Sequence, residues 1–312
     1  MNERGITAVK LIATHLVLVS GLTAATFFIK QDAYLTLIIT QTVLLILIFT
    51  GYWEFFRPGF KSGFVLMIEI LLVISAVHRI NAGEPHNFVP VFTILPGLVE
   101  LYLLFILSKI LIVIFRKERE NLEIAFPFKE GNFLITDGGN SAISRMMNYH
   151  FHSRVHRQRK TNRSMLHATD IVRLNTGKFK FISLVNEDYL LFGQEIFSPM
   201  EGKIIKVVNN IDDNESFSGN YPYNTGNTVV IKKGNYYMLL GHLKKGTIVV
   251  NEGDSVKKEE IIGCAGNSGM SERPHLHMQL VRSDDDNYWS GTGISMTFRG
   301  RNLYKNRKII LK

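Results

Sequence analysis

The segment "NTVVIKKGNYYMLLGHL", Asn227–Leu243, has the pattern of two β-strands joined by a tight turn. Apolar and β-branched residues fill both arms, and "KKGN" at Lys232–Asn235 between them is typical of a hairpin turn. Similar short runs, separated by turn residues, recur in the second half of the chain: Gly131–Thr136, Lys203–Val208, Gly246–Val250 and His275–Val281. Many short strands with glycine-rich turns predict an all-β domain, either a sandwich or a small barrel.

The first part of the chain has a different pattern, with four long apolar stretches that approach the roughly 20 residues needed to cross a bilayer. We expect transmembrane helices at these four stretches: Leu11–Ile29, Ala33–Trp53, Gly63–Val77 and Phe88–Phe115. The predicted organisation is a membrane α-helical region at residues 1–117, a linker at 118–125 and the all-β domain at 126–312. Because no convincing cleavage site follows the first stretch, we expect an uncleaved anchor in contact with membrane lipids.

The basic residues that flank these stretches leave the orientation ambiguous. With four crossings they fall on one side, and the positive-inside rule then places both termini in the cytoplasm. The function suggested below requires the second half of the chain to lie outside. Glu69 and Glu100 fall inside predicted segments, and we interpret them as protonated or paired between helices.

Charge and cysteine content narrow the classes of partner and site. The formal net charge of +9 suits an anionic neighbour such as lipid head groups, a cell-wall polymer or nucleic acid. The basic run "SRVHRQRKTNRS", Ser153–Ser164, lacks the interleaved aromatic residues that stack on bases, so we interpret it as a solvated loop and expect no nucleic-acid partner. The single cysteine, Cys264, excludes a disulfide framework and any multi-cysteine metal site.

Histidines are concentrated in the second half, which suggests a metal site. Of ten in the chain, seven lie there: His150, His152, His156, His167, His242, His275 and His277. In "ERPHLHMQL", Glu272–Leu280, two of them stand at i and i+2, and would share one face of a strand. Zinc is bound by histidine nitrogen and carboxylate oxygen, with three protein ligands and one open position in catalytic sites. The acids near a histidine include Asp170, in "LHATDIV".

The order of these motifs resembles the lysostaphin-type (LytM-like) zinc endopeptidases. The residues that carry the resemblance, over about Phe126–Val281, are "NYH", "ATDIV", "SPMEGKIIKV", "GNTVVI", "LLGHL", "NEGDSV", "GNSG" and "RPHLHMQL". The resemblance implies an antiparallel β core that carries one Zn²⁺ ion. It implies Asp170 and His277 as metal ligands, and His242 and His275 as catalytic residues that flank the reacting water and the scissile carbonyl.

The first histidine ligand departs from the family's common H-x-x-x-D motif, which would place a histidine at Leu166. His167 stands one residue away, but on a strand it would point to the face opposite to Asp170. His150 is favoured, because a subset of the family resembles "N-x-H" followed by "A-x-D-I". His152 would share the strand face of His150 but has no support from a motif.

The resemblance therefore implies a membrane-anchored zinc metalloendopeptidase that hydrolyses peptide bonds in bacterial peptidoglycan, with its peptidase domain outside the cytoplasm. The alternative is an inactive domain of the same fold that binds the wall or a partner and regulates other hydrolases. His242, Asp170, His275 and His277 are all present, which favours an active enzyme. A lipoyl-like carrier, suggested by "VNEGDSVKKEEIIG", lacks a modifiable lysine between methionines.

Overall fold

The computed structural model describes residues 105, 106, 108–152, 162–174, 183–219, 221, 222, 224–285 and 287–312. The chain divides into two compact units, Met1–Lys109 and Ile110–Lys312, and every described strand lies in the second. Within this part of the chain, eleven strands form one sheet and two form another. The strands are β1 (Asn121–Glu123), β2 (Gly131–Asp137), β3 (Thr169–Arg173), β4 (Glu195–Phe197), β5 (Gly202–Val208), β6 (Asn227–Lys233), β7 (Tyr236–Leu243), β8 (Ser255–Val256), β9 (Ile261–Cys264), β10 (Leu276–Arg282), β11 (Thr292–Phe298), β12 (Arg301–Asn302) and β13 (Lys308–Leu311).

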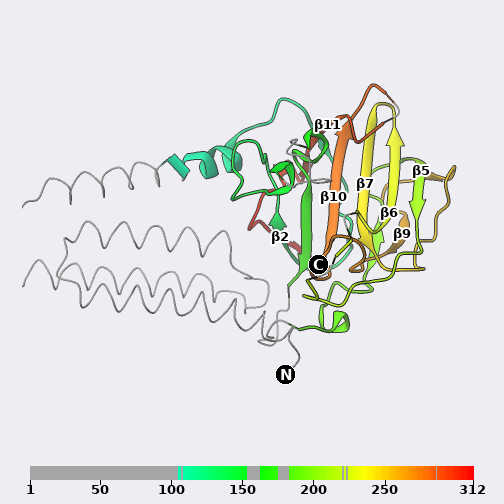
Figure 1. Ribbon diagram of the computed structural model, residues 1–312. Helices are drawn as coiled ribbons and strands as arrows, with labels where there is room; N and C mark the ends of the chain where they lie inside the picture. The colour runs from blue at the N-terminus through cyan, green and yellow to red at the C-terminus, as the bar shows by residue number, and fades with distance from the viewer. Residues whose placement is uncertain are drawn as a thin grey trace, which may run out of the picture. The chain divides into compact units, whose positions relative to one another are not determined.

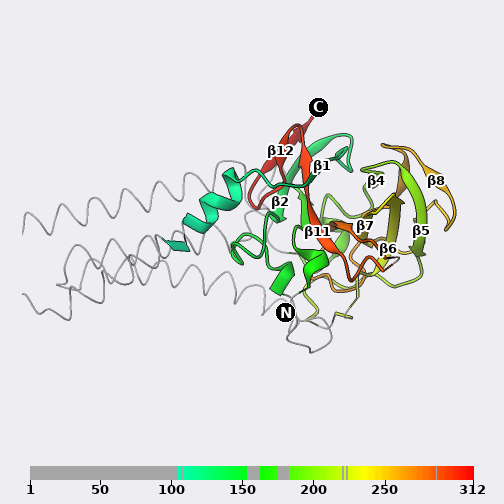
Figure 2. The same cartoon turned by 90° about the horizontal axis from the view of Figure 1, so that it is seen from above.

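The large sheet is mostly antiparallel, with the order β13-β2-β3-β10-β7-β6-β5-β8 (Figure 1). Among the described strands only β1 pairs in parallel, with β11, which also pairs with β10 and β12. Figure 2 shows β1, β11 and β12 close together at one side of the sheet, away from β5 and β8. Strands β4 and β9 form the small sheet. Three short 3-10 helices lie between strands: η2 (His150–His152), η4 (Arg163–Met165) and η5 (Asn186–Asp188).

The hairpin predicted from Asn227–Leu243 is confirmed as β6 and β7, with Gly234 at φ 58° in its turn. Successive residues of the two strands point to opposite faces of the sheet. One set joins the main core: Val229, Ile231, Met238 and Leu240. The other set packs in a smaller cluster with Val281 of β10: Val230, Tyr237 and Leu239. Because both faces are covered, the two arms are apolar without a polar alternation.

Strand β10 is central to the sheet and changes neighbour along its length. Leu276–Met278 pair with β3, whereas Leu280–Arg282 pair with β11, and β7 lies along the other edge. Its even-numbered residues Leu276, Met278 and Leu280 belong to the main core. His277 and Gln279 therefore point to the opposite face of the sheet.

Three of the other four predicted runs are strands, and one is not. Gly131–Thr136, Lys203–Val208 and His275–Val281 correspond to β2, β5 and β10. The segment Gly246–Val250 is irregular, although its side chains alternate, with Ile248 and Val250 buried and Val249 59% exposed. Its alternation reflects burial of every second side chain, without the hydrogen-bond ladder that defines a strand.

The membrane part of the predicted fold class is corrected by the structure, whose described residues form a mostly antiparallel β fold with one α-helix. No helix among the described residues is long and apolar enough to span a membrane. The stretches Leu11–Ile29, Ala33–Trp53 and Gly63–Val77, with Glu69, Glu100 and the expected lipid contacts, lie outside the described residues.

The end of the fourth stretch, Phe88–Phe115, is described as a helix at residues 105, 106 and 108–115. Ile110 and Val113 of this helix are buried, whereas Leu111, Ile112 and Phe115 are exposed. Two of its apolar residues therefore pack against protein, and the domain boundaries proposed from the sequence stay a prediction.

Candidate metal centre

Asp170 of β3 and His277 of β10 are direct partners across the sheet, with His277 also opposite Gly241 of β7. Residues opposite each other in an antiparallel pair project to the same face. The Nδ1 atom of His277 lies 2.9 Å from Oδ1 of Asp170. Strand register therefore brings together two residues that are far apart in the sequence.

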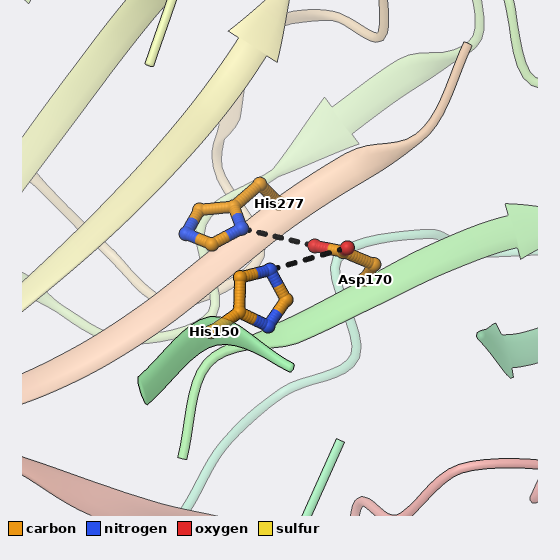
Figure 3. A group of neighbouring side chains, drawn as sticks. All are labelled: His150, Asp170 and His277. Atoms are coloured by element: carbon orange, nitrogen blue, oxygen red, sulfur yellow. Dashed lines mark hydrogen bonds and ion pairs between the residues drawn. The ribbon is translucent and has the colours of Figure 1, made fainter. Parts of the chain in front are cut away.

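His150 approaches the same carboxylate from η2, outside the sheet. Its Nε2 atom lies 3.2 Å from Oδ2 of Asp170. Figure 3 shows the two imidazoles one above the other on the same side of the carboxylate, each with a ring nitrogen directed at one of its oxygens. The candidate ligand atoms of His150, Asp170 and His277 all lie within 4.8 Å of one another.

The donor set fits a metal ion because the lone pairs of three groups converge. His150 has an acceptor at each end of its ring: Oδ1 of Asn148 is 2.8 Å from Nδ1, and Asp170 faces Nε2. His277 lies in the same way between Asp170 at Nδ1 and Oε1 of Gln279, which is 3.3 Å from Nε2. In each ring, the nitrogen that faces Asp170 lies against a carboxylate oxygen. A proton or a metal cation is therefore needed between these two atoms.

The charges in this group depend on one another. Burial alone would raise the pKa of Asp170, but the neighbouring His150 and His275 hold it well below its ordinary value. Burial would lower the pKa of His150, yet the charge of Asp170 and the hydrogen bond to it raise that pKa. An ionised carboxylate flanked by two imidazoles is a suitable ligand set for zinc.

Two more histidines stand beside this group. The imidazole of His242 lies 4.7 Å from that of His275 and 5.7 Å from that of His277, measured between ring centroids. Nε2 of His275 is 3.7 Å from Oδ2 of Asp170. Three imidazoles therefore face one carboxylate, and the fourth, that of His242, lies beside two of them.

Backbone carbonyls orient these two rings. Nδ1–H of His242 donates to the carbonyl of Ser268 at 2.8 Å, and Nδ1–H of His275 donates to the carbonyl of Arg273 at 2.9 Å. In each neutral ring Nε2 is then the basic atom. Burial lowers the pKa of His242 well below its ordinary value, and burial also lowers that of His275. Both rings are therefore neutral at pH 7 and can accept a proton.

Comparison with known proteins identifies the domain. Residues 189–288 match Peptidase family M23. This match covers about a third of the chain, and the β-rich unit that contains it, Ile110–Lys312, is called the M23 domain below. The family match confirms the resemblance noted from the motifs for the peptidase domain. It does not support the predicted multi-pass membrane region.

Relatives of the M23 domain match over short segments. Peptidoglycan DD-endopeptidase ShyA of Vibrio cholerae serotype O1 is 44% identical over 62 residues, which cover 20% of this chain and 14% of that protein. An uncharacterized metalloprotease of Buchnera aphidicola subsp. Baizongia pistaciae is 31% identical over 109 residues, 35% of this chain and 27% of that one. The chain thus spans less than a third of the length of these curated relatives.

Among solved structures, a zinc containing peptidase from Vibrio cholerae matches the M23 domain with 19% identity and a TM-score of 0.32. This match covers 54% of the present chain and 37% of that chain. A score this low carries no argument about function.

The M23 domain brings together five of the residues singled out in the sequence: His150, Asp170, His242, His275 and His277. His167 does not belong to the group of candidate ligands. It is buried, and its pKa falls to about 4 because of burial, with Glu118 and Arg116 as its charged neighbours. The side chain of His152 and all of His156 lie outside the described residues.

Several residues that orient the histidines of the M23 domain were missed from the sequence. Asn148 and Gln279 contact ring nitrogens of His150 and His277, and Ser268 and Ser271 contact His242 and His275. The motifs "NYH" and "GNSG" contain two of these residues, but the sequence pattern alone gives no reason to assign them a partner.

Proposed function

We propose that the M23 domain is a zinc-dependent endopeptidase that hydrolyses peptide bonds in bacterial peptidoglycan. The observation that carries this proposal is the convergence of His150, Asp170 and His277 on one point, with ligand atoms within 4.8 Å of one another. Two buried neutral imidazoles beside them supply proton-transfer groups. The name of the Vibrio cholerae relative, a peptidoglycan DD-endopeptidase, supports the substrate class.

In this proposal His150 binds the ion through Nε2, His277 through Nδ1 and Asp170 through its carboxylate. When bound, zinc supplies a Lewis acid that polarises the scissile carbonyl and lowers the pKa of a water molecule to about 7. The side chains of His150, Asp170 and His275 are 14% exposed, so the group is not sealed from solvent. Since zinc sites of this kind keep an open position, three protein ligands are sufficient.

His242 and His275 act as the groups that move protons. In the neutral rings Nε2 accepts a proton, while Nδ1–H remains bound to a backbone carbonyl. One ring can take the proton of the attacking water at Nε2 and donate it to the leaving amine. The other ring can donate a hydrogen bond to the developing oxyanion only after it has taken a proton from solvent at Nε2. An inactive wall-binding domain is not favoured, because it would have no use for two imidazoles oriented in this way.

The proposed substrate also implies a location. Peptidoglycan lies outside the cytoplasmic membrane, so we place the peptidase domain on that side. The net charge of +9 suits approach to an anionic wall polymer.

Digestion of purified peptidoglycan by the purified protein tests this proposal, with the new peptide termini identified by mass spectrometry. We expect soluble peptides with new amino termini from the wild-type protein. The His242→Ala variant should digest about 100- to 10,000-fold more slowly, because a proton-transfer group is lost, while it retains its zinc. Digestion by this variant at the wild-type rate, or no digestion by a zinc-loaded wild-type protein, would contradict the proposal.

A further inference from the structure

The side-chain amide of Asn148 is fully buried beside His150 and makes four hydrogen bonds. Its Oδ1 accepts from the backbone N–H of His150 at 3.1 Å and from the ring Nδ1 of His150 at 2.8 Å. Its Nδ2 donates to the carbonyls of Gly139 at 2.7 Å and Ala168 at 2.8 Å. The amide therefore uses both lone pairs of its oxygen and both hydrogens of its nitrogen.

These partners allow only one orientation of the amide. Rotating it by 180° would place the nitrogen against the backbone N–H of His150 and the oxygen against two carbonyls. The three hydrogen bonds to backbone groups would become contacts between like groups, and buried polar groups left without partners are costly. The position of Oδ1 next to Nδ1 of His150 is thus fixed by the backbone of Gly139 and Ala168.

A fixed acceptor at Nδ1 determines which nitrogen of His150 carries the proton. Nδ1 must be protonated to donate to Oδ1 of Asn148, so the neutral ring presents the Nε2 lone pair, and Nε2 faces Asp170. We propose that Asn148 is a positioning residue that holds His150 as an Nε2 ligand. This inference rests on the proposed function, because it assumes that the group binds a metal ion. A partner of this kind fixes both the tautomer and the ring orientation of a ligating histidine.

Gln279 has a related position at His277 but does not hold its ring in the same way. Its Oε1 is 3.3 Å from Nε2 of His277, and its Nε2 is buried with no hydrogen-bond partner. Nothing described on the nitrogen side of this amide selects one orientation over the other. The inference is therefore limited to Asn148, whose amide is held on both sides.

The test compares the zinc affinities of two variants that remove a buried asparagine. Asn227 is a matched control, because its Nδ2 also donates to two carbonyls, those of Ile211 and Leu243, and its Oδ1 accepts a backbone N–H from Ile211. Neither amide atom of Asn227 has a described contact with His150, Asp170 or His277. Competition with a chromophoric chelator should show zinc binding about 10- to 100-fold weaker in Asn148→Ala and unchanged in Asn227→Ala.

A second variant and a measurement on the wild-type protein separate positioning from folding. Asn148→Asp keeps an oxygen acceptor for Nδ1, so it should bind zinc more tightly than Asn148→Ala does. In the zinc-loaded wild-type protein, ¹⁵N spectra of the histidine rings should show His150 protonated at Nδ1, which requires no variant to fold. Wild-type zinc affinity in a folded Asn148→Ala protein, or a proton on Nε2 of His150, would overturn this inference and leave the proposed function standing. A wild-type protein that binds no zinc would overturn the proposed function itself.

Discussion

At the scale of single residues, Asp170 determines the arrangement of the candidate site. Its two carboxylate oxygens face different histidines, with His277 at Oδ1 and His150 at Oδ2. The resemblance implied Asp170 and His277 as ligands, and cross-strand register explains why they meet. The motif pattern already favoured His150 over His167, and the fold shows that His150 approaches from a short helix outside the sheet. The structure brings His150 to Asp170, and its role as a ligand stays a proposal.

His167 provides a prediction at the same scale. Its folded pKa of about 4 lies below the ordinary value of 6.5, so the native state binds fewer protons than the unfolded state between these pH values. The stability that this neutral ring contributes is present above pH 6.5 and is lost as the pH falls toward 4. Between pH 7 and pH 4, the wild-type protein should lose about 3 kcal/mol more unfolding free energy than His167→Gln. Urea unfolding at a series of pH values measures this difference, and parallel curves for the two proteins would refute it.

At the scale of secondary-structure elements, the positions of the histidines depend on how strands end. His242 lies at the end of β7 with a φ of 62°, and its Nδ1 donates to the carbonyl of Ser268 in the loop that follows β9. That loop packs closely, since a Cβ atom added to Gly269 would lie 2.2 Å from the backbone nitrogen of Gly226. Glycine at position 269 thus lets the backbone come close enough for Ser268 to reach His242.

Two glycines with similar backbone angles should therefore respond differently to substitution. Gly269 has a φ of 74° and no room for a side chain, whereas Gly234 in the β6–β7 turn has a φ of 58° and open space around it. Gly234→Ala should cost about 1 kcal/mol of unfolding free energy through its left-handed backbone. Gly269→Ala should cost about 1–3 kcal/mol more, because the loop must move, and wall digestion should fall with it. Equal losses of stability in thermal or urea unfolding would count against the close packing of this loop.

Sequence patterns predicted those elements whose own residues favour a strand or a turn. The two arms of Asn227–Leu243 are apolar β-formers around a turn, and the structure has β6 and β7 there. The side chains of Gly246–Val250 alternate between buried and exposed as in a strand, but the segment forms none, because hydrogen-bond partners are not encoded in a local pattern. The parallel pairing of β1 with β11 joins residues far apart in the chain, which a single sequence does not reveal. Likewise, the role of Asn148 depends on the carbonyl of Ala168, twenty positions away in the chain.

At the scale of the whole molecule, hydropathy was an incomplete guide to architecture. The apolar residues Ile110 and Val113 were assigned to a membrane segment, yet they are buried in the β-rich unit. The all-β expectation succeeded because it rested on several independent runs and on their order in the chain, which the match to Peptidase family M23 supports.

The central claim is that His150, Asp170 and His277 together hold one zinc ion. Zinc content by mass spectrometry, after exposure to zinc and removal of the excess, tests it in the wild-type, His150→Ala and His167→Ala proteins. We predict one zinc per chain in the wild-type protein and in His167→Ala, and none in a folded His150→Ala protein. Full zinc content in His150→Ala, or loss of zinc in a folded His167→Ala protein, would contradict the account.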